Sequence, residues 1–446
     1  NNSVLIKQNT VFSTTNSNIT FNGTINSYDN TSARTVGINA GTATVAINGA
    51  VGGSNVLGAT SISGGTVNIG ASGTINMGAN ALTITANTLD IGANISGSST
   101  LTIAPKTATT TIGLGTLATG DLHLNDTELA RLVNGFSSIT FGSATATGKI
   151  TAAEYTYLDS IKLLNYGASS GGIEFIAPVS VGSNNLTLYT TGSVTQASGA
   201  PITAAGLELL GTGGTYTLTN TGNAITTLAG NTGTVSFLEN SGFDIGTVNT
   251  VGLTASTSVT LNSTGTVTQS NLISTPSLLL LGSGGAYTLT NTSNAITTLA
   301  GNTGTVSFLE NSGFAIGAVG STNGVTATTL TLSSTGTVTQ TQALTVTNLE
   351  LLGTGGIYTL TNTGNAITTL AGNTGRVSLV ENSGFDIGTV NTVGLTTSGN
   401  TTLSSTGAVT QSNLIAAAGL ELLGTNGTYT LTNTSNAITT LAGNTG

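Results

Sequence analysis

A 71-residue repeat dominates this 446-residue chain and limits the folds open to it. Four evenly spaced tyrosines mark the repeat: Tyr216, Tyr287, Tyr358 and Tyr429. Each begins a nearly identical stretch such as YTLTNTGNAITTLAGNTG. Three complete units and one partial unit occupy 207–277, 278–348, 349–419 and 420–446. Self-similarity of this kind is typical of solenoids, and the incomplete fourth unit indicates a piece of a longer protein.

A shorter pattern recurs inside each unit. YTLTNTGNAI, VSFLENSGFDI and VTLNSTGTV in the first unit share alternating apolar and polar residues, a polar corner, a glycine and a further β run. The corner glycines Gly222, Gly242 and Gly265 follow one another at short intervals, and Ser293 is their expected equivalent in the next unit. We therefore predict that each unit makes three coils of roughly 20–28 residues.

Coils of this length predict a parallel β-helix, in which each turn contributes two or three short strands. Side chains alternate along a strand, so Tyr216 and Leu218 should both point into the core. Glycine and asparagine should occupy the corners because they tolerate left-handed backbone. Asparagines of adjacent coils are expected to stack in a ladder: Asn220, Asn240 and Asn262.

The first 200 residues follow the same strand and corner pattern less regularly, as in ITFNGTI and LTITANTLDIG. One local exception is NDTELARLVNGF at 125–136. Asn125 and Glu128 have the spacing of a capping box, and Gly135 supplies a stop signal. We predict one or two helical turns near 126–134, packed over a side or corner of the β-helix.

The composition favours an all-β fold whose surface is solvated by hydroxyls and amides. Charged residues make up 5% of the chain and hydrophobic residues 37%, and the latter alternate with threonine and asparagine. Such alternation argues against disorder, and no apolar stretch approaches the roughly 20 residues of a membrane helix. A net charge of −9 with only seven Lys and Arg residues makes nucleic acid and anionic membranes poor partners.

Residues for catalysis, cofactor binding or metal binding do not form a convincing set. Some β-helices act on polysaccharides, a reaction that usually needs two carboxylates. One set of repeated acidic positions consists of Glu239, Asp244, Glu310, Glu381 and Asp386, and Ala315 replaces the aspartate in the second unit. The other set consists of Glu208, Glu350 and Glu421, and Leu279 replaces the glutamate in the second unit. Acids lost from one copy are expected to lie on the solvated surface. His123 is the only histidine, and GTGGTY at 211–216 lacks the lysine of a phosphate loop.

Four stretches resemble the filamentous-haemagglutinin-like exoproteins of bacterial two-partner secretion and β-strand-repeat autotransporter adhesins. They are VTLNSTGTVTQ (259–269), LELLGTGGTYTLTNTGNAITTLAGNTG (207–233), GFSSITFGSATATG (135–148) and INGAVGGSNVLGATSISGGTVNIG (47–70). The resemblance implies a right-handed parallel β-helix, an outer-membrane secretion partner and a place on the cell surface or in the extracellular matrix. The family's N-terminal secretion domain is not recognisable in this sequence.

We therefore expect a secreted structural or adhesive β-solenoid that is not an enzyme. The absence of cysteine fits export through a bacterial envelope. Expected partners are further copies of the chain, end to end or side by side, and glycans or host and abiotic surfaces. One alternative is the subunit of a self-assembling extracellular filament, and another is a β-helix enzyme acting on polysaccharides.

Overall fold

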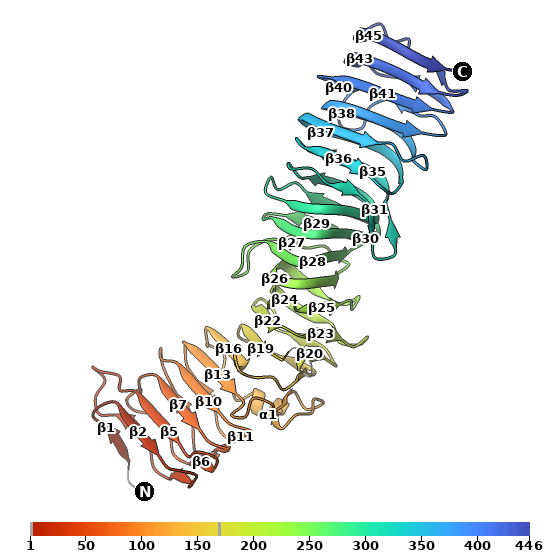
Figure 1. Cartoon of the computed structure of the whole chain (residues 1–446). Helices are drawn as coiled ribbons and strands as arrows, with labels where there is room; N and C mark the ends of the chain where they lie inside the picture. The colour runs from red at the N-terminus through yellow and green to blue at the C-terminus, as the bar shows by residue number, and fades with distance from the viewer. Residues whose placement is uncertain (1–2, 168–170) are drawn as a thin grey trace. The chain divides into compact units, whose positions relative to one another are not determined.

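The computed structural model describes residues 3–167 and 171–446, and they form a parallel β-helix (Figure 1). The chain divides into two compact units, Asn1–Thr226 and Thr227–Gly446. Within each unit, strands pair in parallel with strands of the next coil, which confirms the predicted all-β solenoid.

In the first unit the strands and one helix are β1(Val4–Ile6), β2(Thr10–Ser13), β3(Ile19–Phe21), β4(Ile25–Ser27), β5(Val36–Asn39), β6(Thr44–Ile47), β7(Thr60–Ser63), β8(Thr66–Ile69), β9(Ile75–Asn76), β10(Leu82–Thr85), β11(Thr88–Ile91), β12(Ile95–Ser96), β13(Thr100–Ala104), β14(Ile112–Leu114), β15(Leu122–Leu124), α1(Asp126–Leu129), β16(Ser138–Gly142), β17(Ile150–Ala152), β18(Tyr155–Thr156), β19(Ile161–Asn165), β20(Gly172–Phe175), β21(Val179–Ser180), β22(Asn185–Thr190), β23(Ser193–Gln196), β24(Ile202–Leu210) and β25(Thr215–Leu218).

From the boundary of the two units onward the strands are β26(Ala224–Leu238), β27(Asp244–Ile245), β28(Leu253–Asn262), β29(Thr266–Gln269), β30(Ile273–Leu289), β31(Ala295–Leu309), β32(Ala315–Ile316), β33(Ala318–Val319), β34(Thr322–Asn323), β35(Val325–Ser333), β36(Thr337–Gln340), β37(Leu344–Leu360), β38(Ala366–Glu381), β39(Asp386–Ile387), β40(Leu395–Thr397), β41(Asn400–Ser405), β42(Ala408–Gln411), β43(Ile415–Gly424), β44(Thr428–Tyr429) and β45(Ala437–Thr445).

The coils from β16 to β24 each contain three strands. Strands β16, β17 and β18 pair with β19, β20 and β21, and these pair in turn with β22, β23 and β24. Each of these strands therefore pairs with the strand three places later in the chain, which belongs to the next coil. This arrangement leaves each side of the coil with its own stack of parallel strands.

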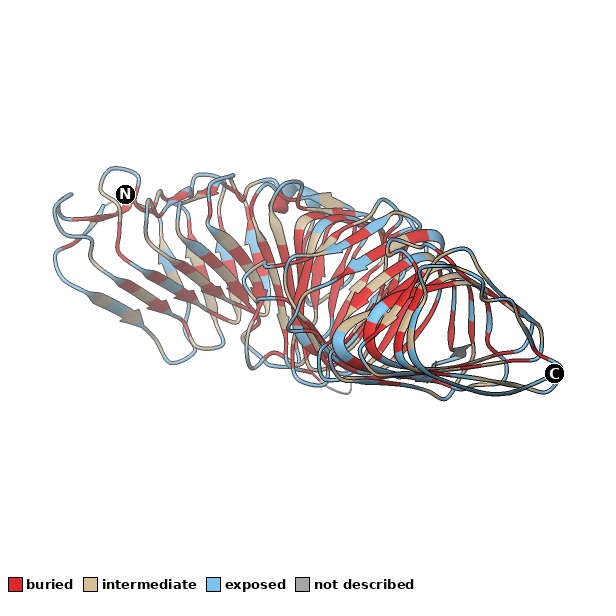
Figure 2. Cartoon of the chain, turned by 90° about the horizontal axis from the view of Figure 1, so that it is seen from above, coloured by how far each residue is buried: buried red, intermediate tan, exposed pale blue. Residues whose placement is uncertain are grey.

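The core is a set of inward side chains stacked from coil to coil. Ile38 pairs with Ile62, Ile62 with Ile84, and each of these residues is at most 2% exposed. Buried and exposed bands alternate along the strands, as period-two geometry requires (Figure 2). Burying one such isoleucine stabilises the fold by about 1.5–3 kcal/mol relative to leaving it exposed.

The predicted helix is present but shorter than expected. It covers Asp126–Leu129, and Asn125 caps it in the predicted reciprocal arrangement with Glu128. Beyond it the chain becomes extended, because Leu132 forms a parallel bridge with Ile95 of the β-helix. The tertiary pairing therefore overrides the helical pattern after one turn.

The repeat does not close after three coils, contrary to the prediction. Tyr287 pairs with Val306, and Val306 pairs with Leu330 one coil later. A third step pairs Leu330 with Leu349. Three coils therefore end at Leu349, whereas Tyr358, the tyrosine of the next unit, lies nine residues beyond it.

A corner separates Leu349 from Tyr358. Gly353 and Gly355 adopt φ values of +114° and +80° there, which glycine adopts without strain. Past this corner Tyr358 pairs with Val338 and Val377 and so belongs to a different stack. The repeat is thus three coils plus one strand, and each unit is advanced by one side of the coil relative to the unit before it.

The repeated tyrosines fill the core and seal a corner. Tyr358 is fully buried, and its hydroxyl lies 2.9 Å from the carbonyl oxygen of Leu332 and 2.6 Å from that of Leu352. Burial raises the pKa of this phenol far above its usual range, although hydrogen bonds to Ser334 and Leu352 act in the opposite direction. The hydroxyl therefore stays protonated and joins two adjacent coils.

Substituting Tyr358→Phe removes this hydroxyl and leaves buried carbonyl groups with fewer donors. We expect the free energy of opening the flanking coils to fall by about 1–2 kcal/mol. Hydrogen exchange of the amides of β36 and β37 measures the change. Tyr28→Phe is the control, since Tyr28 is 52% exposed, and equal effects of the two substitutions would contradict the sealing role.

Candidate functional site

The described residues offer few groups for chemistry. No cluster of three or more His, Cys, Asp or Glu side chains among them could hold a metal ion. In the same residues no helix has the length and apolar character needed to cross a membrane. His123 lies in β15, with its Nε2 atom 3.0 Å from the carbonyl oxygen of Gly115. The acidic side chains of the repeats are therefore the first candidates.

The first set of repeated glutamates is buried, contrary to the prediction of a solvated surface. Its members are Glu239, Glu310 and Glu381. The carboxylate of Glu381 accepts hydrogen bonds from the Ser383 amide at 2.9 Å, the Ser383 hydroxyl at 2.6 Å and the Gly384 amide at 2.5 Å. Gly384 has φ +93° at this corner. A buried carboxylate is tolerated because these donors replace water, so Glu381 is a corner cap.

The aspartates that follow these glutamates bind the neighbouring coil. Asp386 accepts hydrogen bonds from Thr410 at 2.8 Å and from Ser412 at 2.5 Å. Asp244 makes the same contacts with Thr268 and Ser270. The glutamate of a unit thus binds its own corner, and the aspartate binds hydroxyl groups of the neighbouring coil.

The second set of repeated glutamates holds a loop. Glu350 is 1% exposed, and its Oε1 accepts the amides of Asn391 and Thr392 at 3.2 and 2.6 Å. Its Oε2 accepts the Asn391 side-chain amide and the Thr331 hydroxyl, each at 2.8 Å. Burial raises the pKa of Glu350, but these hydrogen bonds outweigh that effect and lower it overall. The loop 388–394 is therefore fastened by an ionised carboxylate.

The middle unit replaces this polar fastening with an apolar one. Leu279 occupies the position of Glu350, and it packs with Ala300 and Val319 in a small buried cluster. Val319 belongs to the antiparallel pair of β33 and β34, which takes the place of the asparagine-containing loop. Glutamate occurs with a loop whose Asn391 and Thr392 donate their amides, and leucine occurs with a loop that has Gly320 and Ser321 at these positions. In this unit, apolar packing of Leu279 against the loop thus replaces the hydrogen bonds that a glutamate accepts.

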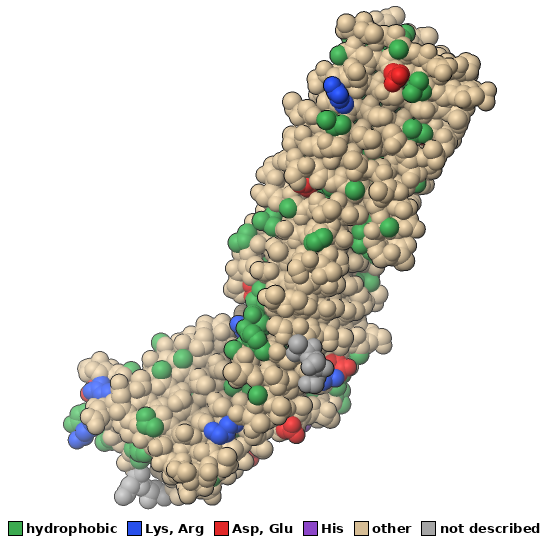
Figure 3. All heavy atoms as spheres, in the orientation of Figure 1, with side chains coloured by type: hydrophobic (Ala, Val, Ile, Leu, Met, Phe, Trp, Pro, Cys, Tyr) green, Lys and Arg blue, Asp and Glu red, His purple; other side chains and the backbone are tan. Residues whose placement is uncertain are grey.

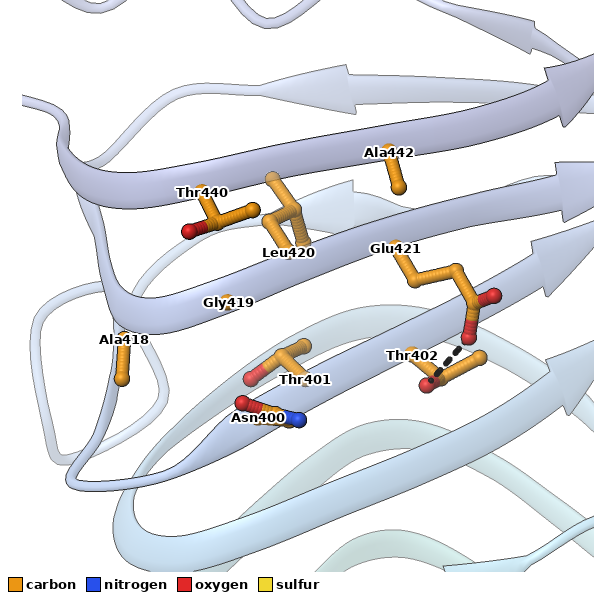
Figure 4. Close-up of a pocket in the computed structure, with 9 residues that line it drawn as sticks. All are labelled: Asn400, Thr401, Thr402, Ala418, Gly419, Leu420, Glu421, Thr440 and Ala442. Atoms are coloured by element: carbon orange, nitrogen blue, oxygen red, sulfur yellow. Dashed lines mark hydrogen bonds between the residues drawn. The ribbon is translucent and has the colours of Figure 1, made fainter.

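The last glutamate of this set lies in an open pocket. Glu421 is exposed, and its Oε2 accepts a hydrogen bond from Thr402 at 3.0 Å (Figure 4). The pocket has a volume of about 400 Å³. Its lining residues are Asn400, Thr401, Thr402, Ala418, Gly419, Leu420, Glu421, Thr440 and Ala442. Glu421 thus makes the hydrogen bond to threonine that Glu350 makes with Thr331.

The predicted core residues lie where expected, and the corner glycines differ from one another. Tyr216 and Leu218 are both fully buried. Gly242 requires left-handed backbone with φ +100°, and a Cβ atom there would lie 2.2 Å from the Thr266 carbonyl oxygen. A Cβ on Gly265 would instead lie 2.5 Å from Ser241 of the preceding coil.

Gly222 and Ser293 do not occupy the corner positions predicted for them. The φ of Gly222 is not left-handed, and a Cβ atom on this residue would lie 3.2 Å from the ring of Pro201. Ser293 is not the stacked equivalent of Gly265. The carbonyl of Gly265 accepts the amide of Ala286, so the chain has already returned to this corner before it reaches Ser293.

The predicted asparagine ladder does not form. The backbone of Asn262 pairs with Leu238, whereas the side chain of Asn240 accepts from Thr264 at 3.4 Å. Asn220 accepts the amide of Gly222 at 2.9 Å. These asparagines are held by their own turn or by a hydroxyl of the next coil, so they do not stack on one another.

Glutamine and asparagine pairs between coils are the polar feature that the sequence interpretation missed. Asn365 is 3% exposed, donates to Gln340 at 3.1 Å and accepts the Leu344 amide at 2.9 Å. Equivalent pairs are Gln196 with Asn223, Gln269 with Asn294 and Gln411 with Asn436. The recurrence of VTQ and NAI in every complete unit is the sequence signal for these pairs.

No protein-family model, curated protein or solved structure matches this chain. The resemblance to filamentous-haemagglutinin-like exoproteins thus remains a prediction, and the β-solenoid fold stands on the structure alone. The structure shows a parallel β-solenoid repeat protein.

The hydrogen bonds to Glu350 predict a pH-dependent loop. Because the folded pKa is lowered, the stabilising contribution is complete above the unfolded pKa of about 4.3 and is lost as the pH falls through the folded value. We expect amide protection factors of Asn391 and Thr392 to fall on acidification. Hydrogen exchange with Val319 as the internal control measures this, and equal responses of both loops would contradict it.

Proposed function

We propose that this chain is a secreted structural or adhesive scaffold of the bacterial cell surface or extracellular matrix. The observation that carries the proposal is that most acidic side chains of the repeated unit make contacts within the chain, whereas hydroxyl and amide groups cover the outer surface. Contacts with glycans, abiotic surfaces or other copies would then be many and individually weak. An outer-membrane secretion partner belongs to the same proposal.

The surface supports contacts that do not depend on charge. Figure 3 shows one face on which Lys, Arg, Asp and Glu side chains are few and scattered. Outward threonines repeat on neighbouring strands, as with Thr326 of β35, which pairs with Thr345 of β37. Both are exposed. Such hydroxyl pairs suit hydrogen bonding to polar polymers.

The advance of each unit by one strand also favours a scaffold. Equivalent surface residues of successive units lie on successive sides of the coil within the second unit, as the different stacks of Tyr287 and Tyr358 indicate. Similar chemistry is thus presented on two sides of the coil. A surface repeated in this way suits many contacts with an extended partner.

The positions of the glutamates weigh against the polysaccharide-enzyme alternative. Glu381 binds a corner, and Glu350 binds a loop. Neither carboxylate has the free oxygen atoms that a pair of glycosidase residues directs at a sugar.

Retention on insoluble polysaccharides tests the adhesive proposal. We expect the purified chain to sediment with one or more of cellulose, chitin and mannan, equally at about 0.05 and about 0.5 M salt, because few charges are available for screening. The double variant Thr345→Val and Thr347→Val should lose only part of the retention, since similar surfaces remain elsewhere. Absence of retention on every matrix, or cleavage of a matrix abolished by Glu239→Gln with Glu381→Gln, would overturn the proposal.

A further inference from the structure

The loops that close on paired glycines differ in length between the repeat units. The amide of Gly394 donates to the carbonyl of Gly388 at 2.8 Å, and that of Gly324 donates to Gly317 at 2.9 Å. The loop 317–324 of the middle unit is one residue longer than the loop 388–394. The stretch from the start of the loop to the next corner glycine nevertheless has the same length in both units, at 317–336 and 388–407. The middle unit therefore has one residue fewer for the strand that follows its loop.

This difference removes a bulge from that strand. In the last complete unit, three residues lie between Thr396 and Asn400, whereas two lie between their partners Ala416 and Gly419 on β43. The unit 207–277 has the same irregularity, since the pairing of β28 with β30 shifts register there. Strand β35 of the middle unit instead pairs with β37 without a register shift. Because a bulge bends and twists a strand, its absence leaves the outward side chains of β35 and β37 in straight rows.

The straight rows consist of threonine on three neighbouring strands. Thr328, Thr347 and Thr368 are exposed and follow buried residues that pair from β35 to β37 and from β37 to β38. Thr326 and Thr345 lie two residues earlier on β35 and β37, and they pair with each other. Residues two apart on a strand are separated by about 6.6 Å, and adjacent coils by about 4.8 Å. We call this flat grid of hydroxyl groups the threonine array.

The threonine array lines a hollow of about 440 Å³ that no charged side chain borders. The buried side chains of Val346 and Ile367 also line it. None of the array hydroxyls has a hydrogen-bond partner among the described residues, whereas the adjacent Thr329 accepts the side-chain amide of Asn348 at 3.3 Å. A hydroxyl can donate one hydrogen bond and accept two, so the array offers its full capacity to a ligand.

We propose that the threonine array binds an uncharged β-1,4-linked glycan that lies along the axis of the coils. In such an extended chain, successive sugar rings follow one another at nearly the separation of adjacent coils. Each ring can therefore meet the threonines of one strand, with its hydroxyls on theirs and its C–H groups on their methyl groups. No cation borders the array, so the ligand needs no anionic group. This inference rests on the adhesive function proposed above and names a ligand and a site for it.

Titration of the full chain with cellohexaose, followed by backbone amide chemical shifts, tests the inference. The matched ligand is maltohexaose, which has the same number of glucose units in a curved α-1,4-linked chain. We expect saturable shifts at Thr326, Thr345, Thr347 and Thr368, and an affinity for cellohexaose at least about fivefold higher than for maltohexaose. Salt should leave this affinity unchanged, because no charge borders the array.

Two matched double variants locate the site. Thr328→Val with Thr368→Val removes two array hydroxyls and should weaken cellohexaose binding by about fivefold or more. Thr257→Val with Thr297→Val is the control at the equivalent positions one repeat earlier, where the strand is bulged and Pro276 replaces the threonine between them. The control should bind as the unmodified chain does. All four threonines are exposed, so both variants should fold, and unchanged amide shifts in the other coils verify this.

Equal affinity for the two sugars, or equal losses in the two double variants, would overturn the inference. Array shifts that depend on protein concentration without sugar would also overturn it, because a second copy of the chain would then occupy the array. No shift with cellohexaose, together with retention of the chain on mannan, would overturn the inference and leave the adhesive proposal standing.

Discussion

Parallel pairing between successive coils is the constraint on which the structure depends. A strand can bond the next coil only in a defined register, and that register decides which inward side chains meet. Tyr287 meets Val306, then Leu330 and Leu349, so residues from unlike parts of the repeat must pack together. One side of the core thus contains tyrosine, valine and leucine in sequence, and each must fit the next at close-packed density.

The same pairing determines how buried polar groups are satisfied. Corners interrupt the ladder, and their backbone amides need acceptors from side chains. Glu381 supplies these acceptors at one corner, and Asn365 with Gln340 links two other corners. A chain with few charges places several of its carboxylates inside because such sites provide converging donors.

Sequence patterns predict the β-helix, the inward tyrosine and leucine positions and the capped helix, because these depend on local alternation and spacing. They fail for features set by distant pairing. Similarity between repeat units suggests that equivalent residues share a side of the coil. Stacked neighbours such as Leu330 and Leu349 nevertheless come from parts of the repeat with dissimilar sequences. The burial of Glu350 likewise depends on Asn391, which lies in a loop two coils later. No local window contains both partners.

The one-strand advance of each unit makes the number of repeats a geometric variable. Gaining or losing a single copy inside such an array would turn every later side chain by one side of the coil. A change of two copies would return them to their former direction, because the stack that runs from Tyr287 to Leu349 continues through Leu370, Ile387 and strand β42 to Tyr429. Recombination between nearly identical units would therefore re-aim whatever the end of the solenoid carries, without altering any residue of it.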